Sequence, residues 1–290
     1  MNGPPVNPVV GQRFQKWTWD GSQWRCAGQG MQIIIQVFNL SGPYTPSPGL
    51  ITAIVEAVGG GAGGGGAQGN LAGPPVTPDD VGWIVGGGGG SSGGYSRSAL
   101  PSALVAGGVN VIIGQGGAGG PPTDGVPGGA GGMTSFGSLV VANGGIGGNA
   151  NVIVSGLLDA TRGQGGARNI VGSIGDLTTW GNGGEHGDNF LFVSGASGAV
   201  GFGGRGGGSY FQSAEVGVPH SATGTVGIAG FFGAGGGGAA SAYASTPVPG
   251  GAGGNGIVVV TEHCFIDAVE PDDCGGQARV ARWRGHEFDD

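Results

Sequence analysis

The sequence predicts a mainly β fold with almost no α-helix, in which an antiparallel, sandwich-like scaffold carries packed polyglycine-II helices and loops. One observation behind this prediction is composition, since the 290-residue chain holds 76 glycines and only 10% charged residues. The other is the set of apolar, β-branched runs between the glycine blocks: Ile33 to Ile35, Ile51 to Val58, Val109 to Ile113 and Ile257 to Val260. Disordered glycine-rich chains lack such runs, so we expect this chain to fold.

The glycine blocks have few side chains to bury, so something other than a core must order them. In polyproline-II geometry the backbone forms no internal hydrogen bonds, and glycine lets neighbouring helices approach closely enough to bond laterally. GGAGG at 116–120, 128–132 and 250–254 keeps an x-G-G spacing, but no G-X-Y register runs far enough for collagen. The pattern favours a bundle of short polyglycine helices, with flexible linkers as the alternative.

Composition divides the chain into three regions. Residues 1–30 form a tryptophan-rich N-terminal module, 31–266 a glycine-rich β/polyglycine domain, and 267–290 an acidic C-terminal tail. Near the start of the second region, MQIIIQVFNLSG and GLITAIVEAV are joined by PYTPSP, whose prolines punctuate a turn. These two segments are therefore expected to pair as antiparallel strands.

The N-terminal module reads as a short β-hairpin. Trp17 and Trp19 alternate before an Asp20-Gly21 turn, and Trp24 follows the turn, which places the tryptophans on one face. Such a hairpin is marginally stable alone, so it needs a partner surface. That surface is either a partner protein, which makes this module an attachment point, or the main domain, which it would cap as an aromatic minicore.

Charge and hydropathy argue against two classes of partner. The formal net charge is −8, with Lys16 as the single lysine and no basic cluster, whereas nucleic-acid binding requires a positive face. No apolar stretch approaches the roughly 20 residues of a membrane helix, and the N-terminus lacks the features of a signal peptide. We expect neither nucleic-acid binding nor membrane insertion.

The three cysteines are too sparse for a disulfide framework. Cys264 and Cys274 could form one bridge, and His263 makes zinc an alternative, although a C-x-x-C pair is missing. Structural cysteines, free or paired, are favoured over a metal site.

Motifs for catalysis and cofactor binding are not found. A phosphate-binding loop requires a lysine that the glycine blocks lack, and the serines of GYSRS and TSFGS do not lie in a G-x-S-x-G elbow. Glu185, His186 and Asp188 form one compact polar cluster, for which a solvated loop is favoured over ion or sugar contact and over catalysis. We expect no enzymatic activity, no catalytic or metal-binding residues and no cofactor.

Recognition is expected to rely on aromatic side chains displayed on glycine-rich loops. Rigid polyglycine supports would leave such side chains little freedom to lose on binding. The alternative is that some of them plug the ends of the sandwich. The candidates are Trp83, Trp180, Phe190, Phe202, Tyr210, Phe211, Phe231 and Phe232.

The order of the glycine blocks resembles the glycine-rich domain family of bacteriophage tail and tail-fibre proteins. The matching blocks, which span most of residues 31–266, are GLITAIVEAVGGGAGGGG, GGGGGSSGGYSRSAL, VNVIIGQGGAGG, TSFGSLVVANGG and GGAGGNGIVVVTE. Residues 150–250 contain no block that matches specifically. The N-terminal GQRFQKWTWDGSQW is similar to tryptophan-containing modules that precede such domains.

This resemblance implies a receptor-binding, adhesin-like virion component near the host-contacting end of a fibre, homotrimeric or mounted on a trimeric stalk. Its partners would be other tail or fibre proteins, contacted by Trp17, Trp19 and Trp24, and a bacterial surface protein or polysaccharide. The particle would be assembled in the host cytoplasm and would expose the protein outside. The alternative is a purely structural part, such as a head decoration, spike or fibre connector. A host-encoded surface protein is a third possibility.

Overall fold

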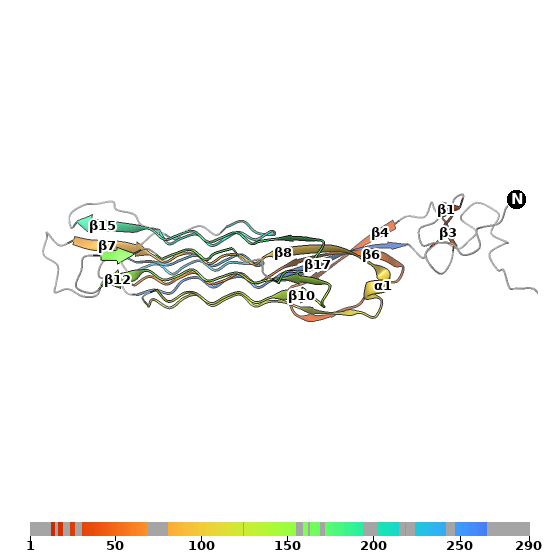
Figure 1. The fold of residues 1–290 in the computed structure, drawn as a ribbon, viewed down its shortest axis with the longest axis horizontal. Helices are drawn as coiled ribbons and strands as arrows, with labels where there is room; N and C mark the ends of the chain where they lie inside the picture. The colour runs from red at the N-terminus through yellow and green to blue at the C-terminus, as the bar shows by residue number, and fades with distance from the viewer. Residues whose placement is uncertain are drawn as a thin grey trace, which may run out of the picture.

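A computed structural model shows an elongated molecule, with a β-sandwich toward one end and a bundle of extended glycine-rich segments along its length (Figure 1). Before residue 27 and at 81–84, 153–154, 159–161 and 189–193 only the backbone is described. The described residues are 13–14, 17–19, 24–26, 31–68, 81–123, 125–154, 159–161, 163–168, 172–193, 202–214, 218, 224–241 and 247–265.

A five-stranded antiparallel sheet forms one layer of the sandwich. Alternate residues of its long strands are buried, as expected for β-branched strands with one face in a core. In spatial order the strands are β14 (Leu177–Thr179), β8 (Tyr95–Pro101), β6 (Leu50–Val58), β17 (Ile257–Phe265) and β4 (Met31–Phe38).

A four-stranded antiparallel sheet forms the second layer. The core between the layers includes Val55, Phe136 and Val258, and the Tyr44 and Phe136 rings lie 5.0 Å apart. The short helix α1 (Ser102–Val105) buries Val105 in the same core. The strands, in order, are β11 (Val140–Ala142), β10 (Thr134–Phe136), β9 (Val109–Ile112) and β5 (Gly42–Tyr44).

The expected pairing of β4 with β6 is wrong. The last strand, β17, lies between them and pairs antiparallel with both, so β4 and β6 run parallel to each other. The turn around residues 45–48 does not close a hairpin, because Gly42–Tyr44 leaves as β5 and joins the opposite sheet. Strand β17 pairs at eight positions with each neighbour, and this extensive pairing outweighs the closeness of β4 and β6 along the chain.

Residues 59–67, which follow β6, run through the middle of the glycine bundle. The amides of Gly59, Ala62 and Gly65 donate to one neighbour at 2.7–3.0 Å, and the amides between them donate to two other neighbours. This three-residue repeat is that of the polyproline-II helix. The segment donates to 86–94, 125–133 and 247–256, and it accepts from 114–121, 143–151 and 234–241.

Residues 86–94 form a second central segment beside the first. They donate with the same repeat, and the two central segments share neighbours at 143–151 and 234–241. The backbone of each is therefore satisfied on all sides by other segments. The remaining partners of 86–94 are 181–188, 163–168 and 202–208. The predicted polyglycine bundle on an antiparallel β-scaffold is confirmed.

Close approach of the segments accounts for the glycine content. A Cβ atom built on Gly61 would lie 1.9 Å from the carbonyl oxygen of Ala234, and one on Gly89 would lie 1.8 Å from that of Arg205. Ser91 and Ser92 are buried exceptions. Their hydroxyls accept the Ile146 amide at 2.7 Å and the Asn182 amide at 2.8 Å, so each side chain joins the lateral network.

Short strands extend the bundle at the end away from the sandwich (Figure 1). Strand β7 (Val81–Gly86) pairs with β15 (Asn189–Val193) and with β16 (Ala240–Ser241). Strand β12 (Val152–Val154) pairs with β13 (Asp159–Thr161). We call this the far end of the bundle.

The N-terminal module contains the predicted hairpin and one more strand. Strand β2 (Trp17–Trp19) pairs antiparallel with β3 (Trp24–Cys26), which places Trp19 opposite Trp24, and with β1 (Arg13–Phe14). Residues 267–290, the predicted acidic tail, lie outside the described residues.

Adding one methyl group to a central segment should destabilise the fold. We expect Gly89→Ala to lower the free energy of unfolding by about 1–3 kcal/mol or more, because the new Cβ would overlap a neighbouring backbone. Gly107→Ala is the matched control, since nothing lies within 4 Å of its added Cβ. Thermal and denaturant unfolding measure the effect; equal midpoints for the two variants would contradict the steric account of the bundle.

Candidate functional site

The predicted aromatic candidates do not form one surface; they lie at opposite ends of the bundle. Trp83 lies in β7, Phe190 lies in β15, and Phe202 is hydrogen-bonded through its amide to Asp188 Oδ2 at 3.0 Å, all at the far end. Their strands bring Trp83 and Phe190 to neighbouring register positions. The Phe202 side chain is 43% exposed, whereas those of Trp83 and Phe190 are not described.

The described glycine segments run alternately outward to this far end and back toward the sandwich. Between an outward segment and the next inward one, residues 69–80, 155–158, 194–201, 219–223 and 242–246 lie outside the described part of the chain.

The other five aromatic candidates lie beside the sandwich. Trp180 directly follows β14, and the ring of Tyr210 stacks on Tyr95, the first residue of β8. Phe231 and Phe232 belong to a turn next to Val58, the last residue of β6. The fifth candidate, Phe211, follows Tyr210.

The turn that carries Phe232 is conformationally unusual. Phe232 has φ of 44°, which a bulky residue adopts rarely, and Gly233 follows with φ of 78°. The turn is closed by the Ala234 amide, which donates to the Phe231 oxygen at 2.8 Å, and Ser209 Oγ donates to the Phe232 oxygen at 2.7 Å. This conformation keeps both phenyl rings at the surface, 61% and 48% exposed.

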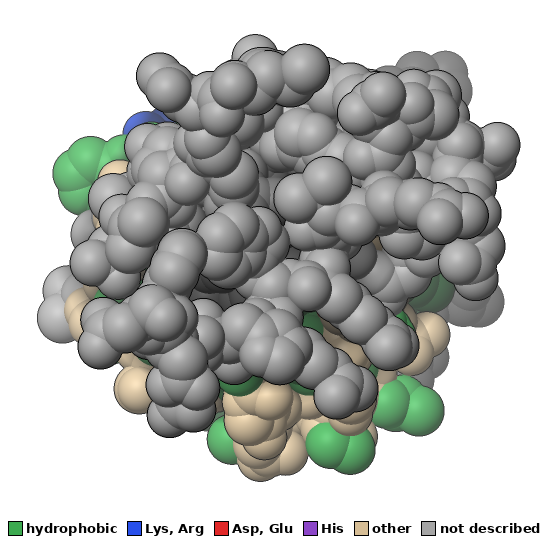
Figure 2. Space-filling view, turned by 90° about the vertical axis from the view of Figure 1, so that its right-hand side faces the viewer, with side chains coloured by type: hydrophobic (Ala, Val, Ile, Leu, Met, Phe, Trp, Pro, Cys, Tyr) green, Lys and Arg blue, Asp and Glu red, His purple; other side chains and the backbone are tan. Residues whose placement is uncertain are grey.

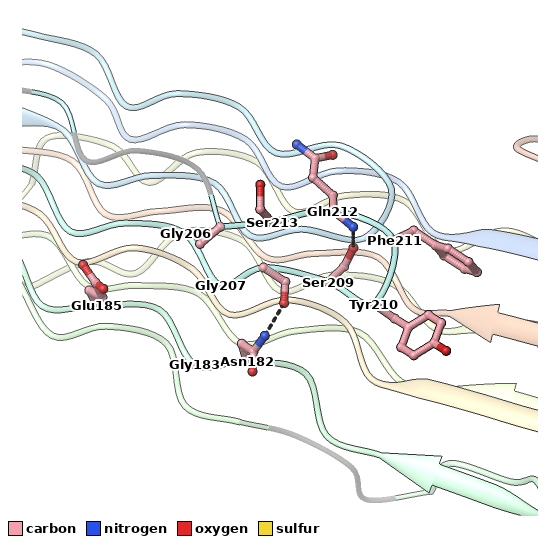
Figure 3. A pocket seen from close by; sticks show the side chains of 12 residues that line it. Asn182, Gly183, Glu185, Gly206, Gly207, Ser209, Tyr210, Phe211, Gln212 and Ser213 are labelled. Atoms are coloured by element: carbon pink, nitrogen blue, oxygen red, sulfur yellow. Dashed lines mark hydrogen bonds between the residues drawn. The ribbon is translucent and has the colours of Figure 1, made fainter.

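Two adjoining cavities lie where the bundle meets the five-stranded sheet, and Figure 3 shows the larger one. One, of about 330 Å³, lies among Tyr95, Thr179, Trp180 and Tyr210; the other, of about 470 Å³, extends from Tyr210 along the bundle toward Glu185. Asn182, Gly208, Ser209 and Tyr210 line both, so the cavities form one groove. We call it the junction groove.

Hydrogen bonds fix the polar side chains of the junction groove. Asn182 Nδ2 donates to the Gly208 oxygen at 2.8 Å, and Ser209 Oγ accepts the Gln212 amide at 3.1 Å, as drawn in Figure 3. Tyr95 donates to Glu56 Oε1 at 2.6 Å. Burial and this bond raise the pKa of Tyr95, so the hydroxyl stays protonated as a donor.

The side chains of the polar cluster predicted around residue 186 do not converge on one site. Glu185 pairs with Arg205 at 3.7 Å, with both side chains more than half exposed. His186 Nδ1 accepts the Gly165 amide at 3.0 Å, and Asp188 accepts the Phe202 amide. Glu185 and Asp188 thus contact segment 202–208, whereas His186 contacts segment 163–168.

The sandwich contains a fully buried carboxylate. Glu262 Oε1 accepts from the Tyr44 hydroxyl at 2.6 Å and from the Ser47 amide at 3.1 Å, and Oε2 accepts from Ser47 Oγ at 2.6 Å. Burial opposes ionisation, but hydrogen bonds from Ser47 and Tyr44 outweigh it and hold the pKa of Glu262 below 4.5. These groups line neither cavity, so their role is structural.

Cys264 is buried beside this carboxylate, and burial followed by the charge of Glu262 raises the pKa of its thiol. Cys274, to which a bridge was one of the alternatives, lies outside the described residues. Among the side chains that are described, His, Cys, Asp and Glu do not gather in groups of three or more that could hold a metal ion.

Edge strand β4 carries an exposed apolar row that was not among the predicted site residues. Met31, Ile33, Ile35 and Val37 are each 57–62% exposed, and within the described chain no strand pairs with the outer edge of β4. Viewed toward this end, hydrophobic side chains predominate over charged ones among the described residues (Figure 2). The sequence contains a sign of this apolar surface, since residues 26–55 contain no charged residue.

No protein-family model matches the chain, and no curated protein matches it. The helix in the described part of the chain is too short to cross a membrane.

Lowering the pH should reduce the contribution of Glu262 to the stability of the fold. A depressed folded-state pKa stabilises the protein above pH 4.5 and loses that contribution as the pH falls through the folded-state value. We expect Glu262→Gln to cost about 1–3 kcal/mol at neutral pH and to flatten the loss of stability below pH 4.5. Unfolding midpoints from pH 7 to 3 measure this. The exposed Glu185→Gln should keep the parental profile, and an unchanged profile for Glu262→Gln would contradict the assignment.

Proposed function

We propose that this protein is a non-enzymatic virion component, a phage tail-fibre or receptor-binding protein that attaches the particle to a bacterial surface. The sandwich end docks onto other tail or fibre proteins, and the far end of the bundle contacts a host protein or polysaccharide. The resemblance of the ordered glycine blocks to phage tail proteins supports this class, and it suggests a trimer or a trimeric mount.

The observation that carries the proposal is the two-ended construction. At one end an edge strand presents an uncharged apolar row, and at the other the chain leaves and re-enters a laterally bonded bundle many times. A laterally bonded bundle holds the bases of these connections at fixed positions. Connections held in this way can differ in sequence without disturbing the core, as recognition loops on a rigid scaffold do.

The apolar row on β4 supports docking through the sandwich end. Edge strands of soluble proteins usually carry charges or bulges that prevent pairing, and β4 carries no charged residue. Exposed contiguous apolar surface of this kind marks protein interfaces. Trp17, Trp19 and Trp24 precede β4 closely in the chain and would extend the same attachment surface.

A purely structural role is the second candidate. It is favoured by the position of Trp180, Tyr210, Phe211, Phe231 and Phe232, which lie beside the sandwich rather than at the far end. An electron-microscopy map of the particle would discriminate, because a head decoration or connector would not lie at the fibre tip.

Purified protein should compete with phage for host cells. We expect pre-incubation of cells with the intact chain to reduce the adsorption rate of the phage in a saturable manner, because both use the same receptor. A variant whose residues 69–80 are replaced by a glycine-serine linker of equal length should compete less well. Failure of the intact protein to bind cells or to compete would contradict receptor binding and favour the structural role.

Charges placed on β4 should block incorporation into particles. We expect the double variant Ile33→Asp, Ile35→Asp to fold with a stability change of about 0.5 kcal/mol or less, since both side chains are exposed, yet to be lost from particles. Immunoblots of purified particles, complemented with each variant, measure this. The control Val226→Asp alters an equally exposed apolar residue in the bundle; normal incorporation of the double variant would overturn the docking assignment.

A further inference from the structure

We infer that the junction groove is a binding site for a neutral oligosaccharide. The groove lies on the side of the molecule where the bundle meets the sandwich, so this inference goes beyond the proposed contacts at the two ends. Its two cavities, of about 330 and 470 Å³, have the size of ligand sites, which is about 300–1,000 Å³.

Two exposed aromatic rings line the smaller cavity. Trp180 is 60% exposed and Tyr210 is 63% exposed, although both lie on well-defined segments beside the sheet. Exposed rings contribute little to folding, whereas a sugar ring can stack its C–H face on an aromatic surface. Trp180 and Tyr210 thus provide two such surfaces within one cavity.

The Tyr210 ring is held in place before any ligand binds. It stacks on Tyr95 with centroids 4.0 Å apart and an interplanar angle of 20°, and Phe211 meets it edge-on at 5.3 Å and 87°. Tyr95 is itself anchored by its bond to Glu56. Since the ring is already ordered, binding costs little conformational entropy.

Polar groups between the rings match sugar hydroxyls. The Nδ2 bond to Gly208 orients the Asn182 amide, whose carbonyl oxygen is an acceptor, and Thr179 and Ser209 contribute hydroxyls to the same cavity. Asn182 and Ser209 also line the larger cavity, which adds Gln212 and Ser213. A chain of two or more sugar units could therefore follow the groove from Trp180 toward the bundle.

The charge of the groove favours a neutral ligand. Glu185 is the one ionisable acid or base among the lining residues of the larger cavity apart from Tyr210, and its carboxylate already pairs with Arg205. An anionic glycan would meet no unpaired cation here. An apolar peptide side chain would gain little, because the cavity walls are glycine backbone and small polar side chains.

Saturation-transfer NMR on the full chain tests the inference. The probes are methyl glycosides of glucose, galactose, mannose and N-acetylglucosamine, together with maltotriose and a neutral O-antigen fragment from the host. We expect transfer to at least one probe, strongest at its C–H protons. Transfer to none of them would overturn the inference.

Matched variants locate the site. We expect Trp180→Ala and Tyr210→Ala each to raise the dissociation constant about tenfold or more, as loss of an anchoring aromatic typically does. Phe231→Ala removes an equally exposed ring outside the groove and should bind normally. Trp180→Ala keeps the test valid if Tyr210→Ala unfolds, because Trp180 is largely exposed. Unchanged binding by folded Trp180→Ala would place the sugar elsewhere.

Phage adsorption separates this inference from the proposed function. If wild-type protein competes for host cells but no probe binds, the groove assignment fails and receptor binding stands. If probes bind in the groove but the protein does not compete, glycan binding stands and the attachment role fails. Binding of host surface peptides in place of sugars, with the same dependence on Trp180, would also overturn the oligosaccharide assignment.

Discussion

Lateral hydrogen bonding between glycine backbones is the interaction on which the rest of this structure depends. Each central segment directs successive amides to three different neighbours, and it accepts bonds from three more. The segments approach so closely that a single Cβ atom would lie within about 2 Å of a neighbouring carbonyl at many positions. Glycine content is therefore a steric requirement of the packing, and backbone hydrogen bonds take the place of a large side-chain core.

This bundle needs a template, and the sandwich provides it. Strands β6, β8, β9, β10, β11, β14 and β17 each continue directly or nearly directly into a glycine segment, so sheet register sets the relative heights at which the segments begin. The lateral hydrogen bonds repeat every three residues, so the segments keep this register along the bundle. Alternation of outward and inward segments follows from chain connectivity, so one end of every segment lies at the sandwich and the other at the far end of the bundle.

The sequence predicts what depends on composition and local pattern, and it fails where distant segments decide. The x-G-G blocks, the β-branched strands and the tryptophan hairpin each follow from neighbouring residues. Pairing of β4 with β6 fails because β17, about 200 residues later in the chain, takes the position between them. The aromatic candidates separate into two groups because the end that each residue reaches depends on the running direction of its segment. Tyr95 was missed because its partner Tyr210 meets it only through packing.

The residues that stabilise the bundle are different from the exposed residues that are available for binding. The residues that hold the bundle together are glycines whose substitution is sterically forbidden, while the exposed groups of β4, the junction groove and the far end contribute little to that bonding. Surface side chains can therefore change at small cost in stability. Ser91 and Ser92 mark the limit of this freedom within the bundle, because each hydroxyl accepts an amide that a neighbouring segment would otherwise leave unpaired. Variation is permitted where the chain faces solvent and is restricted where backbone meets backbone.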